Sequence, residues 1–205
     1  MREIAALATR QGRSRRDDDG TLCANRDGGT LSSMPAGHKV GDMMSDIAIR
    51  FAEPSDASLV LRLIRELAVY ERAPVAVVAT EDDLRRHGFG PERQFEAILA
   101  FLNGEPAGFA LFHPRFSTWL GCPGLYLEDL YVTETARGRG VGRRLMTRLA
   151  AIAIERGWAR IDFQVLDWNP ARGFYHRLGM GHLGEWLRYG ADLEILRQLA
   201  AEDRN

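Results

Sequence analysis

The sequence has few cysteines, no long apolar run and almost no net charge, and these absences exclude several classes of protein. The two cysteines, Cys23 and Cys122, have neither CxxC spacing nor a nearby histidine, so they indicate no metal cluster and no disulfide framework. No apolar run reaches the ~18 residues that a membrane helix needs. A net charge of −1 gives no global attraction to nucleic acid or membranes. We therefore expect a cytoplasmic, metal-free protein without nucleic-acid or membrane partners.

What is present fits one globular domain preceded by a tail. The chain has 205 residues, of which 45% are hydrophobic and 27% charged, as is usual for a soluble domain with a sizeable core. Residues 1–46 are rich in Gly, Ser, Asp and Arg, and we expect a disordered extension there. Residues 47–205 are predicted to form the single domain. Because Met43 and Met44 directly precede it, a misplaced start codon is an alternative explanation of the tail.

Hydrophobic periodicity predicts a mixed α/β protein. Strands are expected over 47–51, 95–102, 105–112, 125–132, 161–166 and 182–189. Helices are expected over 54–70 and 81–88, from the glycine-rich loop to about residue 154, and over 170–178 and 192–201. The residues from Thr80 to Asp83 resemble a capping box for the second of these helices. Asn103-Gly104 is a strong signal for a tight hairpin between the second and third strands. This order of elements predicts one mixed sheet with helices on both faces.

A glycine-rich basic loop joins the apolar strand from Leu125 to the amphipathic helix around Leu145. It reads Arg137-Gly138-Arg139-Gly140-Val141-Gly142 and is followed by Arg143 and Arg144. The first N–H groups of a helix have no internal partner, and the helix dipole favours an anion there. Glycine lets those N–H groups approach an anion closely, and arginine adds positive charge with a geometry suited to phosphate. We therefore predict a phosphate-binding loop.

The spacing decides which phosphate the loop fits. A Walker loop would end in Gly-Lys-Ser/Thr, and the dinucleotide fingerprint would need a third glycine at position 143, which is arginine. The pattern Arg-x-x-Gly-x-Gly instead resembles the pyrophosphate loop of acetyl-CoA-dependent N-acetyltransferases of the GNAT superfamily. The strand before the loop and Gly173-Phe174-Tyr175 after it strengthen this resemblance.

Three further stretches narrow the resemblance to a subfamily. LYLEDLYV (125–132), LIRELAVYE (63–71) and HGFG (87–90) are similar to diamine (spermidine/spermine) acetyltransferases and their thialysine-acetylating relatives. The likeness covers about residues 47–201. It implies the GNAT fold, a central mixed, mostly antiparallel twisted sheet with a splay between two parallel strands. It also implies acetyl-CoA as co-substrate, a small amine as acceptor, and a homodimer.

The resemblance assigns the catalytic roles. Tyr175 corresponds to the general acid that protonates the departing thiolate, and a phenol keeps its proton at neutral pH. Glu128 resembles the carboxylate that holds the amine and acts as base through a water. The plainer alternatives are a packing tyrosine and a surface acidic pair. Because strand alternation sends neighbouring side chains to opposite faces, we do not expect Asp129 to share the pocket of Glu128.

The cofactor residues follow from the same resemblance. The strand backbone is expected to pair with the pantetheine amides, and the N–H of Val132 or Tyr131 is the expected oxyanion donor. Asn169 is expected to contact CoA, although the family pattern places asparagine one residue earlier, at Trp168. The predicted cofactor-binding residues are Leu130, Tyr131, Val132, Arg137, Gly138, Arg139, Gly140, Val141, Gly142, Arg143 and Asn169.

The acceptor site is expected to be acidic. By resemblance Tyr70, Glu71, Glu128 and Glu185 line it, while a solvated helix end is the plainer interpretation of Tyr70 and Glu71. An acidic wall opposite the arginine-rich loop suits a cationic acceptor and an anionic cofactor. Two alternatives remain open: a protein amine or an aminoglycoside as acceptor, and a non-catalytic acyl-CoA-binding sensor.

Overall fold

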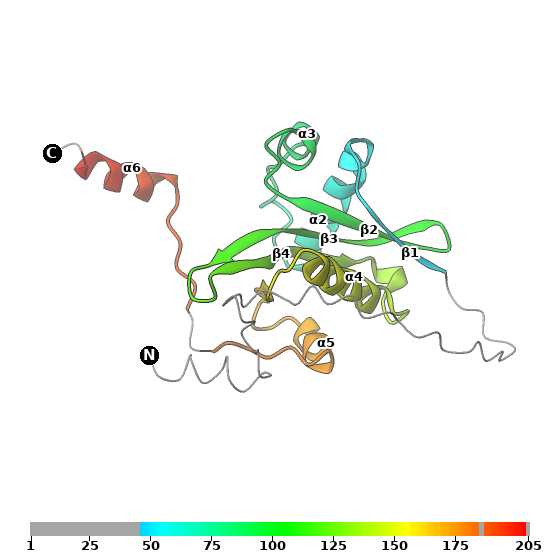
Figure 1. Cartoon of the computed structure of the whole chain (residues 1–205). Coiled ribbons are helices and arrows are strands. Elements are labelled where there is room, and N and C mark those ends of the chain that lie inside the picture. The colour runs from blue at the N-terminus through cyan, green and yellow to red at the C-terminus, as the bar shows by residue number, and fades with distance from the viewer. Residues whose placement is uncertain (1–45, 185–186, 204–205) are drawn as a thin grey trace, which may run out of the picture. The chain divides into compact units, whose positions relative to one another are not determined.

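The computed structural model describes residues 46–184 and 187–203 of the chain. Two compact units are present, the first ending at Gln164 and the second beginning at Val165. The first unit holds the sheet and three of the labelled helices, and the second holds α5 and α6 (Figure 1). That residues 47–205 form one domain stays a prediction.

The first unit is built on a five-stranded mixed sheet. The strands follow the order of the chain, and neighbours are antiparallel except for the last pair, which is parallel. The predicted mixed sheet is therefore confirmed. The strands are β1 (Ile47–Phe51), β2 (Glu96–Leu102), β3 (Glu105–Ser117), β4 (Cys122–Val132) and β5 (Ile161–Phe163).

The turn between β2 and β3 has the conformation that its sequence favours. Asn103 has φ 54° and Gly104 has φ 86°, and positive φ at both central residues is what a type I′ hairpin turn requires. Leu102 and Glu105 pair directly across the turn. The predicted hairpin is confirmed.

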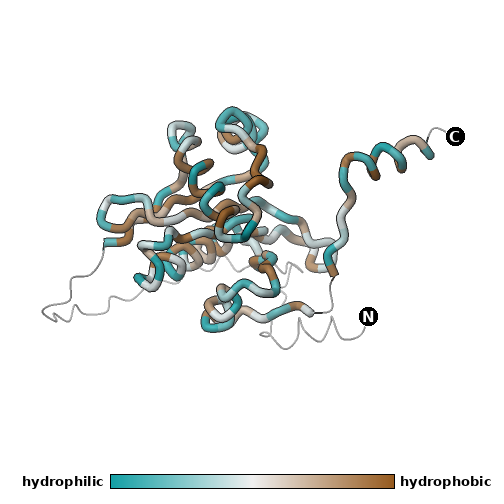
Figure 2. Tube along the Cα trace, turned by 180° about the vertical axis from the view of Figure 1, so that it is seen from behind, coloured by the Kyte–Doolittle hydropathy of each residue, from teal (hydrophilic) through white to brown (hydrophobic). Residues whose placement is uncertain are grey.

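Helices cover both faces of the sheet. The helices α2 (Ala57–Tyr70) and α3 (Glu81–Phe89) lie on one face, and α4 (Val141–Glu155) lies on the other (Figure 1). Hydrophobic residues gather along the strands and on the inner sides of these helices (Figure 2). Short 3-10 turns, η1 (Pro54–Asp56) and η2 (Glu134–Ala136), precede α2 and follow β4.

The core beneath α2 orients the strands that carry the predicted site. The helix has one apolar stripe at helical spacing, and this stripe is buried against side chains of β2, β3 and β4. Those buried members are Val60, Leu61, Leu63 and Leu67 from α2, and Leu99, Phe109, Leu111 and Tyr131 from the strands. The helix α3 begins with the predicted capping box, in which Thr80 and Asp83 exchange bonds between side chain and backbone.

Four predicted strands need correction. The strand β3 continues to Ser117, and β4 begins at Cys122 rather than at residue 125, because the two form a longer hairpin in which Ser117 pairs with Cys122. The strand β5 ends at Phe163 rather than at residue 166, since it pairs with only three residues of β4. In the described part of 182–189 no strand is present. A periodic pattern forms a strand only where a neighbouring strand offers its backbone, and the described part of the second unit has none.

The second unit contains two helices, α5 (Ala171–Arg177) and α6 (Leu193–Glu202), close to the predicted ranges. Asp192 caps α6 by accepting a hydrogen bond from the backbone N–H of Ile195. Over the described ranges, none of the helices combines the length and apolarity that crossing a membrane requires.

Candidate active site

A β-bulge interrupts β4 at the two predicted carboxylates. Leu111 of β3 pairs with Asp129, whereas the next residue, Phe112, pairs with Leu127. Glu128 is therefore an extra residue without a partner of its own in β3. Such a bulge bends the strand and redirects the side chains around it.

The bulge brings Glu128 and Asp129 to the same face of the sheet. Asp129 is paired with Leu111, which packs in the core beneath α2. Glu128 lies beside His113, with 3.9 Å between Oε2 and Nε2. Because His113 is two residues from Leu111, it points to the same face. The expectation that Asp129 points away from the pocket of Glu128 is wrong, since strand alternation fails at the extra residue.

Three carboxylates influence one another on this face. Burial, together with the negative charges of Glu128 and Glu71, raises the pKa of Asp129 to about 6. Burial also raises the pKa of Glu71, which follows the last residue of α2. The structure thus brings Glu71 near the bulge, as the acidic-wall prediction expects, and adds Asp129 to that wall. This concentration of negative charge favours a cation.

Arg137 connects the loop to the predicted acceptor residue Tyr70. Its guanidinium lies 4.5 Å from the centre of the Tyr70 ring and 5.7 Å from that of Tyr131. Its Nε donates a hydrogen bond of 3.2 Å to the carbonyl of Val132. Arg137 therefore supports the junction of α2, β4 and the loop; it is also exposed, and its contact with the diphosphate stays a prediction.

The loop has the backbone that an anion site needs. Gly138 and Gly140 have φ values of 73° and 87°, in the left-handed region that favours glycine. Gly140 is the N-cap of α4, and no side chain closes that helix end. A Cβ added to Gly138 would meet no atom within 4 Å, so the space beside it is open. Arg139, Arg143 and Arg144 are exposed around this open end.

Among the described residues, no strand pairs with the last residues of β4 on the side away from β3, which leaves an open backbone edge. Leu125–Leu127 pair with β5 on that side, whereas β4 continues to Val132, which agrees with the predicted splay. The Thr133 N–H bonds to the Ala107 carbonyl. Since alternate residues of an antiparallel pair share one direction, the Tyr131 N–H faces β3, whereas those of Leu130 and Val132 face the open edge.

The second unit holds the predicted Tyr175 and Asn169. Tyr175 is buried in α5, with its ring 5.1 Å from that of Phe174 in an edge-on arrangement. Asn169 is buried, and its Oδ1 accepts a hydrogen bond from the Ala171 N–H at the start of α5. This bond gives Asn169 a structural task, and its contact with CoA stays a prediction. Glu185 lies outside the described residues.

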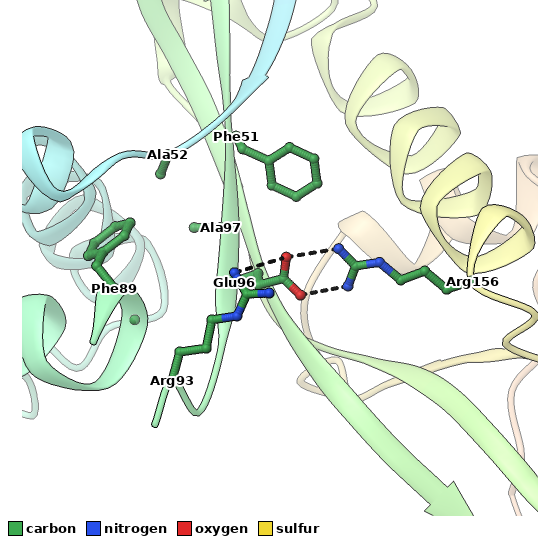
Figure 3. A pocket seen from close by; sticks show the side chains of 8 residues that line it. Phe51, Ala52, Phe89, Arg93, Glu96, Ala97 and Arg156 are labelled. Atoms are coloured by element: carbon green, nitrogen blue, oxygen red, sulfur yellow. Dashed lines mark hydrogen bonds and ion pairs between the residues drawn. The ribbon is translucent and has the colours of Figure 1, made fainter. Parts of the chain in front are cut away.

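A separate cavity of about 250 Å³ lies elsewhere in the first unit, and none of the predicted site residues lines it (Figure 3). Glu96 of β2 projects into it and accepts two hydrogen bonds from Arg156, of 2.6 and 2.9 Å. Arg93 approaches the same carboxylate at 3.9 Å. The charged groups of this cavity are paired with one another, so they stabilise the fold rather than mark a second reaction centre.

Comparison with protein families identifies the architecture. The model of the acetyltransferase (GNAT) family matches residues 61–180, a range that runs from α2 through the bulge and the loop to the end of α5. The chain belongs to the GNAT acetyltransferase family. GNAT acetyltransferases use acetyl-CoA as co-substrate, and the matched range contains both the glycine-rich loop and the open edge of β4.

Individual relatives agree with this assignment. The chain is similar to the thialysine N-epsilon-acetyltransferase of Sus scrofa, at 36% identity over 78% of this chain and 100% of the relative. It is similar to the human spermidine/spermine N(1)-acetyltransferase-like protein 1, at 37% identity over 65% of this chain and 20% of that one. An integron cassette protein from the mobile metagenome of V. cholerae superposes with a TM-score of 0.63, at 28% identity over 75% of this chain and 97% of the other.

Two residues of the candidate site are not predicted from the sequence. Asp129 is missed because strand alternation does not continue through the acidic pair. His113 carries no local signal, because its position beside Glu128 depends on the register of β3 against β4. Only the pairing of the two strands could reveal either residue.

Proposed function

We propose that this GNAT acetyltransferase transfers the acetyl group of acetyl-CoA to a primary amine of a small cationic acceptor, such as a diamine, a polyamine or a thialysine-like amine. The amine attacks the thioester directly while both substrates are bound. The observation that carries the proposal is the acidic grouping of Glu128 and Asp129, on the strand that leads into the arginine-rich loop, with Glu71 at the end of α2. The relatives named for thialysine and spermidine/spermine acetylation support the same class of acceptor.

The chemistry requires a base, an oxyanion donor and an acid. An alkylammonium has a pKa near ~10.4 and must lose a proton before it can attack. Glu128 is exposed at the bulge and can accept that proton, directly or through a water. In this proposal the Val132 N–H at the open edge of β4 donates to the developing oxyanion. Tyr175 then protonates the thiolate of CoA.

The first unit fits the two ends of the cofactor. The open backbone edge formed by Leu130 and Val132 can pair with the amides of pantetheine, as an added strand would. The glycine loop, with its left-handed backbone and uncapped helix, can receive the diphosphate. The exposed arginines of the loop then neutralise phosphate charge. A homodimer remains part of the proposal, by analogy with the subfamily.

A panel of acceptors tests the proposal. Purified protein is incubated with acetyl-CoA and one amine at a time, and the release of CoA is followed. The panel contains thialysine, lysine, putrescine, spermidine, an aminoglycoside and a peptide with a free N-terminal amine. We expect saturable turnover with small amines that carry a second cationic group. Turnover with the peptide or the aminoglycoside alone would assign another acceptor, and CoA binding without turnover would indicate a sensor.

A further inference from the structure

His113 of β3 has a defined tautomer. Its Nδ1 lies 3.1 Å from the carbonyl oxygen of Pro114. A carbonyl can only accept a hydrogen bond, so Nδ1 must carry the hydrogen. In the neutral imidazole this leaves Nε2 with a lone pair and no hydrogen. The ring therefore presents a proton acceptor on its other side.

That acceptor faces the carboxylate at the bulge. Nε2 of His113 lies 3.9 Å from Oε2 of Glu128, and an ionised carboxylate also only accepts hydrogen bonds. Two facing acceptors are brought together by a proton or by a water that donates to both. When both side chains are in their basic forms, neither of the two facing atoms carries a proton. The pair can therefore take up one proton.

Neighbouring groups hold the imidazole in this orientation. The centre of the Tyr126 ring lies 5.2 Å from that of the His113 ring, and the Arg115 guanidinium lies 5.5 Å from the centre of the Tyr126 ring. The side chain of His113 is 35% exposed and that of Glu128 is 55% exposed. Asp129 is more deeply buried and already experiences the charges of Glu71 and Glu128. Of the two neighbours of Glu128, His113 has the route to bulk water.

We infer that His113 is the proton relay of this acetyltransferase, taking from Glu128 the proton that Glu128 removes from the acceptor ammonium. The inference rests on the proposed function. Nothing in the sequence pattern or in the family assignment places a histidine in this role. It follows from the bulge, which sets Glu128 beside a histidine of the neighbouring strand.

The proton balance is complete with these groups. The ammonium R–NH₃⁺ gives one proton to the Glu128 carboxylate, which passes it to Nε2 of His113, and the imidazolium releases it to water. The neutral amine attacks the thioester carbonyl, and the C–S bond breaks as the C–N bond becomes an amide. Tyr175 protonates the leaving thiolate and regains a proton from the amine nitrogen. The sum is one acetamide, one CoA thiol and one released proton.

The test uses the full chain with the best amine from the acceptor panel. His113→Gln keeps a polar side chain of similar size that cannot carry the proton. We expect kcat to fall by about 10²-fold, as is typical for loss of acid–base assistance, while the KM values for both substrates change less than threefold. His87→Gln is the matched control, because His87 is exposed on α3 away from the bulge. A kcat within twofold of wild type, or a loss confined to KM, would overturn the relay.

Two additional measurements separate a relay from a packing role. In His113→Ala, added imidazole should restore turnover in proportion to its concentration, whereas Glu128→Gln should not respond. The double variant His113→Gln/Glu128→Gln should be no slower than Glu128→Gln alone, since both residues serve one proton. Additive losses and no imidazole response would overturn the inference. If wild type itself turns over no amine, the proposed function fails first and the relay falls with it.

Discussion

Two adjacent carboxylates on one face of a strand repel each other when both are charged, and this raises the free energy of the folded state. The pKa of Asp129 is raised to about 6 by burial and by the charges of Glu128 and Glu71. A carboxyl whose pKa is higher in the folded than in the unfolded chain stabilises the fold at low pH. That contribution is lost as pH rises from about 3.8, the ordinary value, to about 6. A cationic acceptor would reduce this repulsion among the carboxylates when it binds. Binding of the amine should therefore stabilise their charged forms.

Asp129→Asn should therefore stabilise the free protein at neutral pH. Asparagine removes the free-energy cost of ionising a buried carboxyl. At about 1.4 kcal/mol for each unit of pKa shift, the free energy of unfolding should rise by at most about 3 kcal/mol. Urea unfolding at pH 4 and pH 7.5 measures this, and we expect the gain over wild type to be larger at pH 7.5. Glu105→Gln, an exposed acidic residue at the β2–β3 hairpin, is the control. An equal gain at both pH values would contradict the buried, charge-crowded environment of Asp129.

The Tyr175 phenol is the predicted acid, and its loss should affect chemistry more than binding. Tyr175→Phe keeps the buried ring and removes only the hydroxyl. We expect kcat to fall by about 10²-fold, with the Kd for CoA from calorimetry unchanged within a factor of two. Tyr189→Phe, in the same unit but 88% exposed, should leave both values at the wild-type level. Wild-type turnover in Tyr175→Phe would exclude the general-acid role.

At the scale of elements, the loop before α4 combines a left-handed backbone with open space for an anion. A matched pair of substitutions can separate the effects of these two properties. Gly138 and Gly121 both have left-handed backbones, with φ of 73° and 69°, and a Cβ added to either would meet nothing within 4 Å. Gly121 lies in the β3–β4 turn, away from the loop. Alanine should therefore cost a similar amount of conformational free energy at the two positions. The positions differ in their surroundings.

Gly138→Ala and Gly121→Ala should each destabilise the fold by about 1 kcal/mol, because alanine adopts the left-handed region less readily than glycine. Only Gly138→Ala should weaken CoA binding, by tenfold or more, since its methyl group occupies the space predicted for the diphosphate. Thermal unfolding and calorimetry measure the two effects. Equal CoA affinity in both variants would remove the loop from the cofactor site.

A second element-level contact joins β2 to the end of α4. Glu96 and Arg156 form a two-bond ion pair at the cavity of Figure 3, and the hydrogen bonds from Arg156 lower the pKa of Glu96. A lowered carboxyl pKa stabilises the fold above the unfolded value of 4.5, and this contribution is lost as pH falls below it. The pair therefore supports the sheet at neutral pH.

Arg156→Gln should lower the free energy of unfolding by about 1–2 kcal/mol at pH 7, reduced from a buried pair because Arg156 is about one-third exposed. The loss should become smaller at pH 4. Arg148→Gln removes a more exposed pair, with Glu155, and should cost less than about 1 kcal/mol. Chemical denaturation of both variants decides the matter. A larger loss for Arg148→Gln would show that the bidentate geometry contributes nothing.

At the scale of the whole molecule, the exposed apolar side chains of α6 bear on assembly. The helix presents Leu193, Leu196 and Leu199 with exposed fractions of 60%, 53% and 56%. Side chains of this kind are more stable when another surface covers them. The homodimer implied by the resemblance would provide such a surface.

We predict that light scattering coupled to gel filtration gives the mass of a dimer. Leu196→Glu combined with Leu199→Glu should shift the protein toward the monomer if α6 takes part in the contact. Arg197→Glu, a change of charge on the same helix, is the control. A monomeric wild type at micromolar concentration would contradict the prediction.

Most elements of the first unit could be predicted from local patterns. The stripe of α2, the Thr80 capping box and the Asn103-Gly104 turn each depend on residues close in sequence, and each forms as expected. The errors lie where a strand needs a partner. The length of β3 depends on how far β4 accompanies it, and the region 182–189 lacks a neighbouring strand among the described residues.

The sequence by itself determined the glycine-rich basic loop, because glycine spacing, arginine charge and the start of α4 are all local properties. It also determined the acidic character of the neighbouring strand. Only the tertiary structure decided which carboxylates act together. One extra residue in the register of β4 against β3 turns Asp129 to the side of Glu128 and sets His113 beside it. Register is a relation between two strands, so no single stretch of sequence contains it.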